Sequence, residues 1–260
     1  PEDNLAFVRY HFLHSQRATP ERAETTEAMM NRMRYAATIF GVTEQTQAVV
    51  ESLYLDYLEA LNTHFEHYPY LLGWRPSVGD FGLVAPMYAH LGRDPHPAKL
   101  MQQRAVSVRR WVERMNRADQ DVPEFFNAGT EFIDDDDVPQ SLMAVLRIFG
   151  EDFVPETLAA ADSINGWLAE NKPETGTPAV GRLAQAAGTA TFVLRGDTIE
   201  ALAQPHRFYL LQRVQDDYAS LSETEKSAVD AVLSKSGMTA ILDASLNRRI
   251  ERADNLEVWV

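Results

Sequence analysis

The sequence contains no cysteine, which excludes disulfides, thiolate metal sites, iron–sulfur clusters and cysteine nucleophiles. No apolar run approaches the roughly 20 residues that a helix needs to cross a bilayer, so we expect no membrane-spanning segment. Basic residues are also scarce, with 24 Lys and Arg against 38 Asp and Glu, for a net charge of −14. A uniform basic surface for nucleic acid is therefore not expected.

The negative charge lies in one part of the chain. Residues 1–118 contain 13 basic and 13 acidic side chains, whereas residues 119–260 contain 11 and 25. This asymmetry predicts two differently built segments, 1–118 and 119–260, and the acidic one should repel nucleic acid and anionic lipid. We therefore expect neither nucleic acid nor a membrane as a partner.

The start of the sequence lacks the features of a secretory leader. Neither a basic segment nor an apolar segment follows Pro1, so the simplest expected location is the cytoplasm. The chain opens without Met, just before a helical pattern, and this start is typical of a fragment of a longer protein.

Helical spacing of apolar residues dominates residues 1–118. The longest stripe follows the i, i+3, i+4, i+7 rule from Val49 to Phe65. The helix before it is opened by Thr19 and Pro20 and should end at Gly41. Its expected buried stripe consists of Met29, Met30, Met33, Ala37 and Phe40.

Residues 119–260 are more varied. An acidic loop is expected over 119–137, then one helix over 142–149 and a second opened by Pro155. Residues 189–194 form the only β-like run, and Gly196-Asp197 can turn it back onto 198–202 as a small hairpin. Two more helices should begin at Pro205 and at Ser222. The predicted fold class is therefore all-α, a helical bundle followed by a mainly helical extension with one small hairpin.

Ser77 and Asp80 have the spacing of a helix capping box. The Ser77 hydroxyl would accept from the backbone of Asp80, while the carboxylate reaches back to the Ser77 amide. A catalytic Ser/Asp pair is the alternative, but no nearby histidine supplies a base, so we assign both residues to structure. The helix behind them is apolar enough to lie in the centre of a domain, and its apolar residues are Phe81, Val84, Ala85, Tyr88 and Leu91.

The segment YLLGWRPSVGDF at residues 70–81, followed about 30 residues later by WVERM at 111–115, resembles the C-terminal helical domain of glutathione S-transferases. The resemblance covers residues 1–118 in helix order and spacing, with one departure, Gly79 where the family commonly has Ala. YLLQRVQDDY at 209–218 and RADN at 252–255 are similar to the long C-terminal extension of some bacterial members.

The resemblance implies a function in glutathione chemistry. Glutathione would be the co-substrate, its thiolate would attack a small hydrophobic electrophile, and two copies would form a homodimer. The first helix of this domain lines the electrophile pocket in the family, which makes Tyr10, His11 and His14 the candidate substrate-binding residues. The family activates the thiol in an N-terminal thioredoxin-like domain, and residues 1–76 offer no such strands, so no catalytic residue is assigned.

Several patterns admit a second interpretation. Pairs of histidines three apart, His11 with His14 and His64 with His67, could build a zinc site, although packed or exposed histidines are simpler, and no metal is expected. The four aspartates 134–137 could bind calcium, but they lack the alternation and Gly of such loops. Arg213 is expected to pair with Asp216 or Asp217, and the alternative is that these residues hold an anionic ligand such as a carboxylate. The arginines of 104–117 are expected to form a solvated face or a subunit contact.

Two hypotheses from different classes follow. The first is an enzyme fragment, the helical substrate-binding portion of a glutathione S-transferase-like protein that a thioredoxin-like domain would complete. The second is a non-catalytic helical module for protein interaction on the same scaffold, suggested by the long acidic extension.

Overall fold

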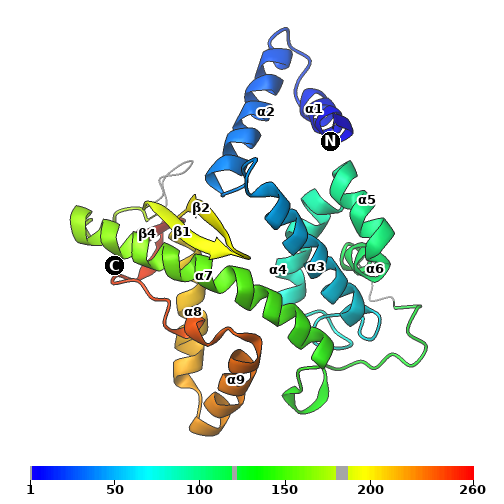
Figure 1. Ribbon diagram of the computed structural model, residues 1–260, viewed down its shortest axis with the longest axis vertical. Helices are drawn as coiled ribbons and strands as arrows, with labels where there is room; N and C mark the ends of the chain where they lie inside the picture. Colours follow the sequence, from blue (N-terminus) through cyan, green and yellow to red (C-terminus); the bar gives the residue numbers. More distant parts are fainter. Residues whose placement is uncertain (1, 119–121, 180–186) are drawn as a thin grey trace. The chain divides into compact units, whose positions relative to one another are not determined.

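The computed structural model describes residues 2–118, 122–179 and 187–260. Within these ranges the chain is mostly helical, at 61% helix, with nine α-helices and two separate two-stranded sheets (Figure 1). It forms two compact units, one made of Pro1–Tyr35 with Ser52–Val145 and the other of Ala36–Glu51 with Leu146–Val260. The predicted division between residues 118 and 119 stays a prediction. The boundaries between the two units fall inside three helices. Residues 119–121 of the predicted acidic loop lie outside the described residues.

The first unit is a group of helices around one apolar core. Leu58 and Phe65 of the third helix are buried there, and the ring of Phe65 stacks on Trp111 with centroids 4.9 Å apart. Trp111 is fully buried. The elements of this part of the chain are α1 (Glu2–His14), α2 (Arg22–Ile39), α3 (Gln47–Phe65), α4 (Val78–Pro86), η1 (Met87–Leu91), α5 (Pro95–Arg104), α6 (Val106–Met115) and η2 (Asp134–Asp136).

The chain continues from α4 into a π-helical turn, η1. Pro86 ends α4 and has no backbone N–H to donate. The loss of that donor accounts for the change in hydrogen bonding, because π-turns appear where the regular i to i−4 pattern is interrupted. The predicted helix through Leu91 therefore exists, but its second half has the wider π geometry.

The prediction of a buried stripe on α2 is wrong for most of its residues. Met30 is buried, but 48% of Met33 and 47% of Phe40 are exposed. α1 contains no buried residue. A helical apolar period shows which residues share a face, but a face is buried only if another element covers it.

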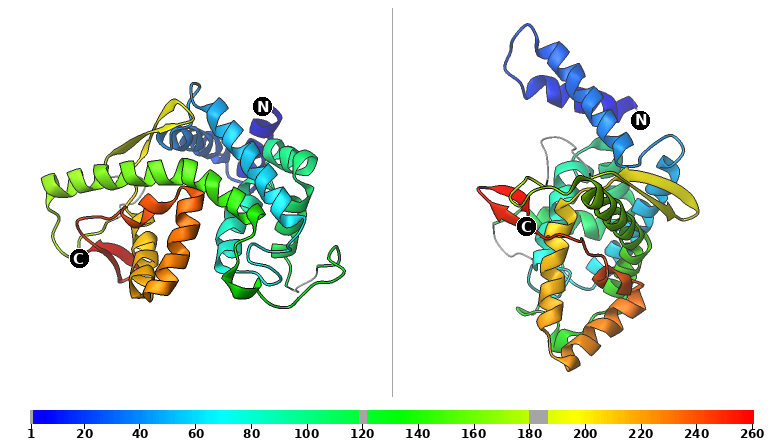
Figure 2. Two further views of the ribbon diagram at one scale, coloured as in Figure 1. Left: turned by 60° about the horizontal axis from the view of Figure 1, so that its bottom comes forward. Right: turned by 90° about the vertical axis from the view of Figure 1, so that its left-hand side faces the viewer.

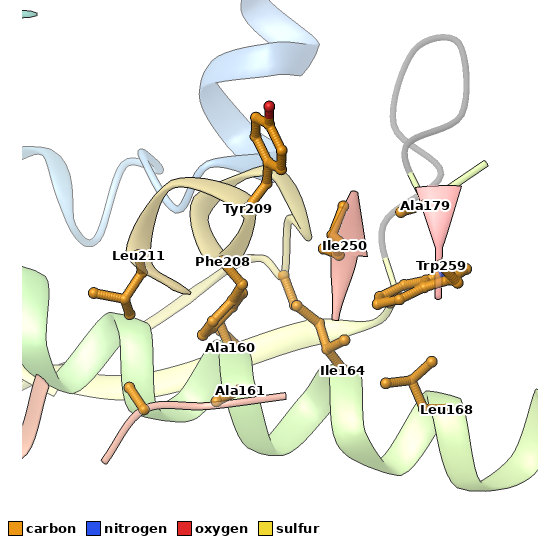
Figure 3. Packing of buried hydrophobic residues seen from close by; sticks show 14 of the residues in the cluster. Ala160, Ala161, Ile164, Leu168, Ala179, Phe208, Tyr209, Leu211, Ile250 and Trp259 are labelled. Atoms are coloured by element: carbon orange, nitrogen blue, oxygen red, sulfur yellow. The ribbon is translucent and has the colours of Figure 1, made fainter. Parts of the chain in front are cut away.

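The second unit is built along the C-terminal part of α7 (Gln140–Asn171). Its core joins Ile164 and Leu168 of α7 to Phe208 of α8 and Trp259 of β4, as Figure 3 shows. The other elements, visible in Figures 1 and 2, are β1 (Thr189–Leu194), β2 (Asp197–Leu202), α8 (His206–Ser220), α9 (Glu223–Ser236), η3 (Thr239–Leu242), β3 (Ile250–Ala253) and β4 (Leu256–Trp259).

α7 is a single helix where the sequence predicts two. Pro155, expected to open a second helix, lies inside α7. A proline in a helix interior costs about 3 kcal/mol. The buried residues that follow it on the same helix, among them Ala160, Ile164 and Leu168, outweigh this cost because each loses apolar surface to the core.

Both sheets are antiparallel hairpins closed by two-residue turns. The predicted hairpin is confirmed, and its turn residues Arg195 and Gly196 both have positive φ, which is typical of the tight turns that match strand twist. The second hairpin, β3–β4, was not predicted. Its turn, Asp254-Asn255, again has positive φ at both positions.

Candidate functional site

The segment that carries the family resemblance forms a capping box at the start of α4. The Ser77 hydroxyl accepts from the backbone N–H of Asp80 at 3.4 Å, and the Asp80 carboxylate accepts from the backbone N–H of Ser77 at 2.8 Å. The Ser77 hydroxyl also donates to the same carboxylate at 2.7 Å. The cap thus leaves neither of these donors unpaired at a buried helix end.

Asp80 joins this cap to two other parts of the chain. Its Oδ1 accepts from the backbone N–H of Leu71 at 3.0 Å and from the indole N–H of Trp111 at 3.0 Å. The side chain is fully buried, so a single carboxylate holds the start of α4, the preceding loop and α6 together. Four donors around one anion provide the stabilisation that a buried charge requires.

A buried histidine continues the polar cluster. His64 of α3 is fully buried, with Nδ1 2.9 Å from the Ser141 hydroxyl and Nε2 3.1 Å from the carbonyl of Leu71. Nε2 faces only carbonyls and therefore carries the proton, so Nδ1 accepts from Ser141. Burial lowers the pKa of His64, against the opposing effect of the nearby carbonyls and of Asp80. At neutral pH this imidazole is uncharged, and its contacts are those of a structural group.

Tyr10, His11 and His14 lie together on α1. The ring centroids of Tyr10 and His14 are 4.2 Å apart, and the ring centroids of Tyr10 and His11 are 5.8 Å apart. The Tyr10 side chain is 60% exposed, and His11 Nδ1 lies 2.9 Å from the backbone carbonyl of Phe7. The three rings therefore form an accessible aromatic surface, which suits stacking against an apolar ligand. They carry no contact that would activate a nucleophile.

The two histidine pairs do not converge within the described parts of the chain. His64 is occupied by Ser141 and two carbonyls, and His67 Nδ1 lies 2.9 Å from the carbonyl of Thr63. Among residues 2–118, 122–179 and 187–260, no group of three or more His, Asp or Glu side chains could hold a metal ion.

The outer face of α4 is the feature that sequence reasoning missed. Val78, Phe81 and Tyr88 are 90%, 60% and 50% exposed, although the whole helix was expected to be buried. Val78 and Phe81 are three residues apart, which places them on one side of α4, and Tyr88 follows in η1. The opposite side carries the buried residues Asp80 and Met87. The signal in the sequence was that this helix is apolar on all sides. A helix of this kind is normally covered on all sides by other parts of a protein or by a partner.

The comparisons with known proteins do not add to this geometry. No protein-family model, curated protein or solved structure matches the chain. Within the residues that the structure describes, no helix is both long enough and apolar enough to cross a membrane.

The second unit contains a cluster of charges on α7 and its neighbours. Arg207 of α8 donates to Glu156 and, at 3.0 Å, to the Thr157 hydroxyl, and Arg195 pairs with Glu151 at 2.9 Å. Arg213 does not pair with Asp216 or Asp217 as expected. It donates to the Tyr209 hydroxyl and lies over that ring, while Asp216 pairs with Arg249 at 2.6 Å.

Asp152 in this cluster should make stability depend on pH. Burial raises its pKa to about 6, Glu156 adds to the rise, and Arg207 opposes it. The unfolded chain ionises Asp152 at its ordinary, lower pKa, so the folded state loses stability as pH rises from about 4 to about 6. We expect Asp152→Asn to stabilise the protein by about 1–2 kcal/mol at pH 7, after allowing for partial exposure.

Urea denaturation at pH 7 and pH 4.5 measures this effect. The advantage of Asp152→Asn over the wild type should shrink at the lower pH, where the folded wild-type carboxyl is protonated. Asp162→Asn, an exposed site on the same helix, should change stability by less than about 0.5 kcal/mol at both pH values. An advantage of Asp152→Asn that is equal at both pH values would contradict the explanation.

Proposed function

We propose that this chain is the helical, substrate-binding portion of a glutathione S-transferase-like protein, which acts together with a thioredoxin-like domain. The observation that carries the proposal is Asp80. This carboxylate binds Leu71 and Ser77 of the segment at 70–81 and Trp111 of the segment at 111–115. The two stretches on which the resemblance rests are thus parts of one buried hydrogen-bonded unit.

The outer face of α4 supports the second half of the proposal. Val78 and Phe81 of α4 and Tyr88 of η1 have exposed apolar side chains, whereas Asp80 and Met87 of the same two elements are buried. Exposed apolar stripes of this kind mark surfaces that another domain or chain covers. A thioredoxin-like domain covering this stripe would exclude water from both partners.

The proposed reaction is attack by the glutathione thiolate on a hydrophobic electrophile, which forms a carbon–sulfur bond as the leaving group departs with its electron pair. The thioredoxin-like domain would stabilise the thiolate. The contribution of this chain would be an apolar wall, in which Tyr10, His11 and His14 offer ring faces to the electrophile and exclude water from it.

Retention of the full-length gene product on immobilised glutathione tests the proposal. We expect the protein to bind, to elute with free glutathione, and to conjugate glutathione to an aromatic halide. Tyr10→Ala should raise the KM for the halide while leaving retention on glutathione unchanged, because Tyr10 is assigned to the electrophile. Lys99→Ala, an exposed site on α5, should change neither quantity.

Failure of the full-length protein to bind glutathione would overturn this proposal in favour of the interaction module. That second candidate is favoured by the low burial of α1 and α2, where Leu5, Met33 and Tyr35 are 44%, 48% and 66% exposed. Under it, the protein should form a stable homodimer or complex in size-exclusion chromatography without any affinity for glutathione.

A further inference from the structure

A polar groove runs along one side of α3, within the first unit, and is bordered by the last residue of α5. Asp56, Glu59 and Thr63 of α3 line the groove at intervals of three and four residues, which places them on one side of the helix. Arg104, at the C-terminal end of α5, forms another part of the wall. The groove has a volume of about 610 Å³, which is within the range of small-molecule sites.

The walls of the groove are polar and held in place. Asn62, also in the lining, accepts through Oδ1 from the backbone N–H of Ser107 at 2.9 Å, and this bond ties α3 to the start of α6. The Thr63 hydroxyl donates to the backbone carbonyl of Glu59 at 3.1 Å, so its oxygen can still accept a hydrogen bond. Among the described residues of the lining, Leu55 has the one apolar side chain. The groove is therefore suited to a polar ligand rather than to a hydrophobic one.

Two opposite charges line the groove without neutralising each other. Glu59 and Arg104 are exposed, and neither side chain forms a hydrogen bond or an ion pair with the residues that the structure describes. Asp56 adds a second carboxylate to the lining. A carboxylate and a guanidinium that share one groove and do not pair are both available to a ligand. The ligand that complements them carries a positive group and a negative group.

We propose that this groove binds a short peptide with free ends. The α-amino group of the peptide would lie against Asp56 and Glu59, and its terminal carboxylate would accept from Arg104, whose guanidinium has the fork geometry that carboxylates fit. The Thr63 oxygen would accept from a peptide N–H. A purely anionic or purely cationic ligand would leave one of the charges unpaired. The inference goes beyond the proposed function, because it requires neither a thiol nor a second domain.

Calorimetric titration of the whole chain with triglycine, at constant ionic strength, tests the proposal. We expect saturable binding to one site. Amidation of the peptide's C-terminus and acetylation of its N-terminus should each weaken binding about fivefold, because each change removes one solvent-exposed ion pair. Triglycine contains no thiol, so the result is independent of whether the protein binds glutathione. No saturable binding of triglycine, or equal binding of the free and the modified peptides, would overturn the proposal.

Arg104→Gln assigns the carboxylate end of the peptide. The variant should bind triglycine about fivefold more weakly and bind triglycine amide as the wild type does, because the amide offers no carboxylate to Arg104. The Arg104 side chain makes no bond in the described fold, so the variant should keep its stability. Arg32→Gln on α2 is the matched control, because Arg32 is also exposed and its loss changes the net charge equally. Equal weakening in the two variants, or an equal loss for both peptides in Arg104→Gln, would overturn the site.

Discussion

Asp80→Ala is expected to lower the free energy of unfolding by about 3–5 kcal/mol, the largest effect of any single polar substitution in the first unit. The change removes one acceptor from four donors at once: the backbone N–H groups of Leu71 and Ser77, the Ser77 hydroxyl, and the indole of Trp111. Each donor would be left buried without a partner, and a buried network loses more than one isolated bond. Urea denaturation followed by tryptophan fluorescence measures the loss.

Two further variants separate the network from the cap alone. Ser77→Ala removes only the capping hydroxyl and should cost about 0.5–2 kcal/mol. Asp3→Ala removes an exposed carboxylate from the first turn of α1 and should cost less than about 1 kcal/mol. If Asp80→Ala were no more destabilising than Ser77→Ala, the hydrogen bonds to Leu71 and Trp111 would not contribute to the free energy of unfolding. The contact between the two motif segments would then not stabilise the fold.

Local signals in the sequence predicted the elements of this fold. Ser77 with Asp80, and Ser222 with Glu225, each satisfy the helix donors three residues away, so the spacing alone locates two helix starts. The turn at Gly196 predicted the first hairpin. These features depend on neighbours within a few residues, so the local sequence is enough to predict them.

Contacts between distant residues could not be predicted in the same way. Asp80 meets Trp111 across 31 positions, and Asp216 meets Arg249 across 33. The expected local partner of Asp216 was Arg213, three residues away on the same helix. A helix pair at this spacing is worth only a few tenths of a kcal/mol, so contact with the Tyr209 ring or with a distant arginine readily replaces it.

The candidate substrate-binding residues Tyr10, His11 and His14 were named from the family resemblance, and their role stays a prediction. Their rings lie together on α1. The exposed stripe of Val78, Phe81 and Tyr88 was missed because the helical period cannot tell which of two apolar faces the remaining chain covers.

Substitution by alanine is expected to change the stability of the protein in opposite directions at two glycines of α7. A Cβ built on Gly150 would lie 2.3 Å from the backbone carbonyl oxygen of Ser236, at the end of α9. A backbone oxygen cannot swing away as a flexible side chain can. We therefore expect Gly150→Ala to destabilise the second unit by about 3 kcal/mol, despite the higher helix propensity of alanine.

Gly166→Ala on the same helix is the matched comparison. A Cβ at Gly166 meets nothing within 4 Å, so alanine should stabilise the protein by about 0.5–1 kcal/mol through reduced backbone entropy in the unfolded chain. Thermal denaturation followed by circular dichroism compares the two variants, and the melting temperature should fall in one and rise in the other. A rise in both would mean that α9 does not approach α7 closely at Gly150, whereas a fall in both would mean that α7 is not helical at Gly166.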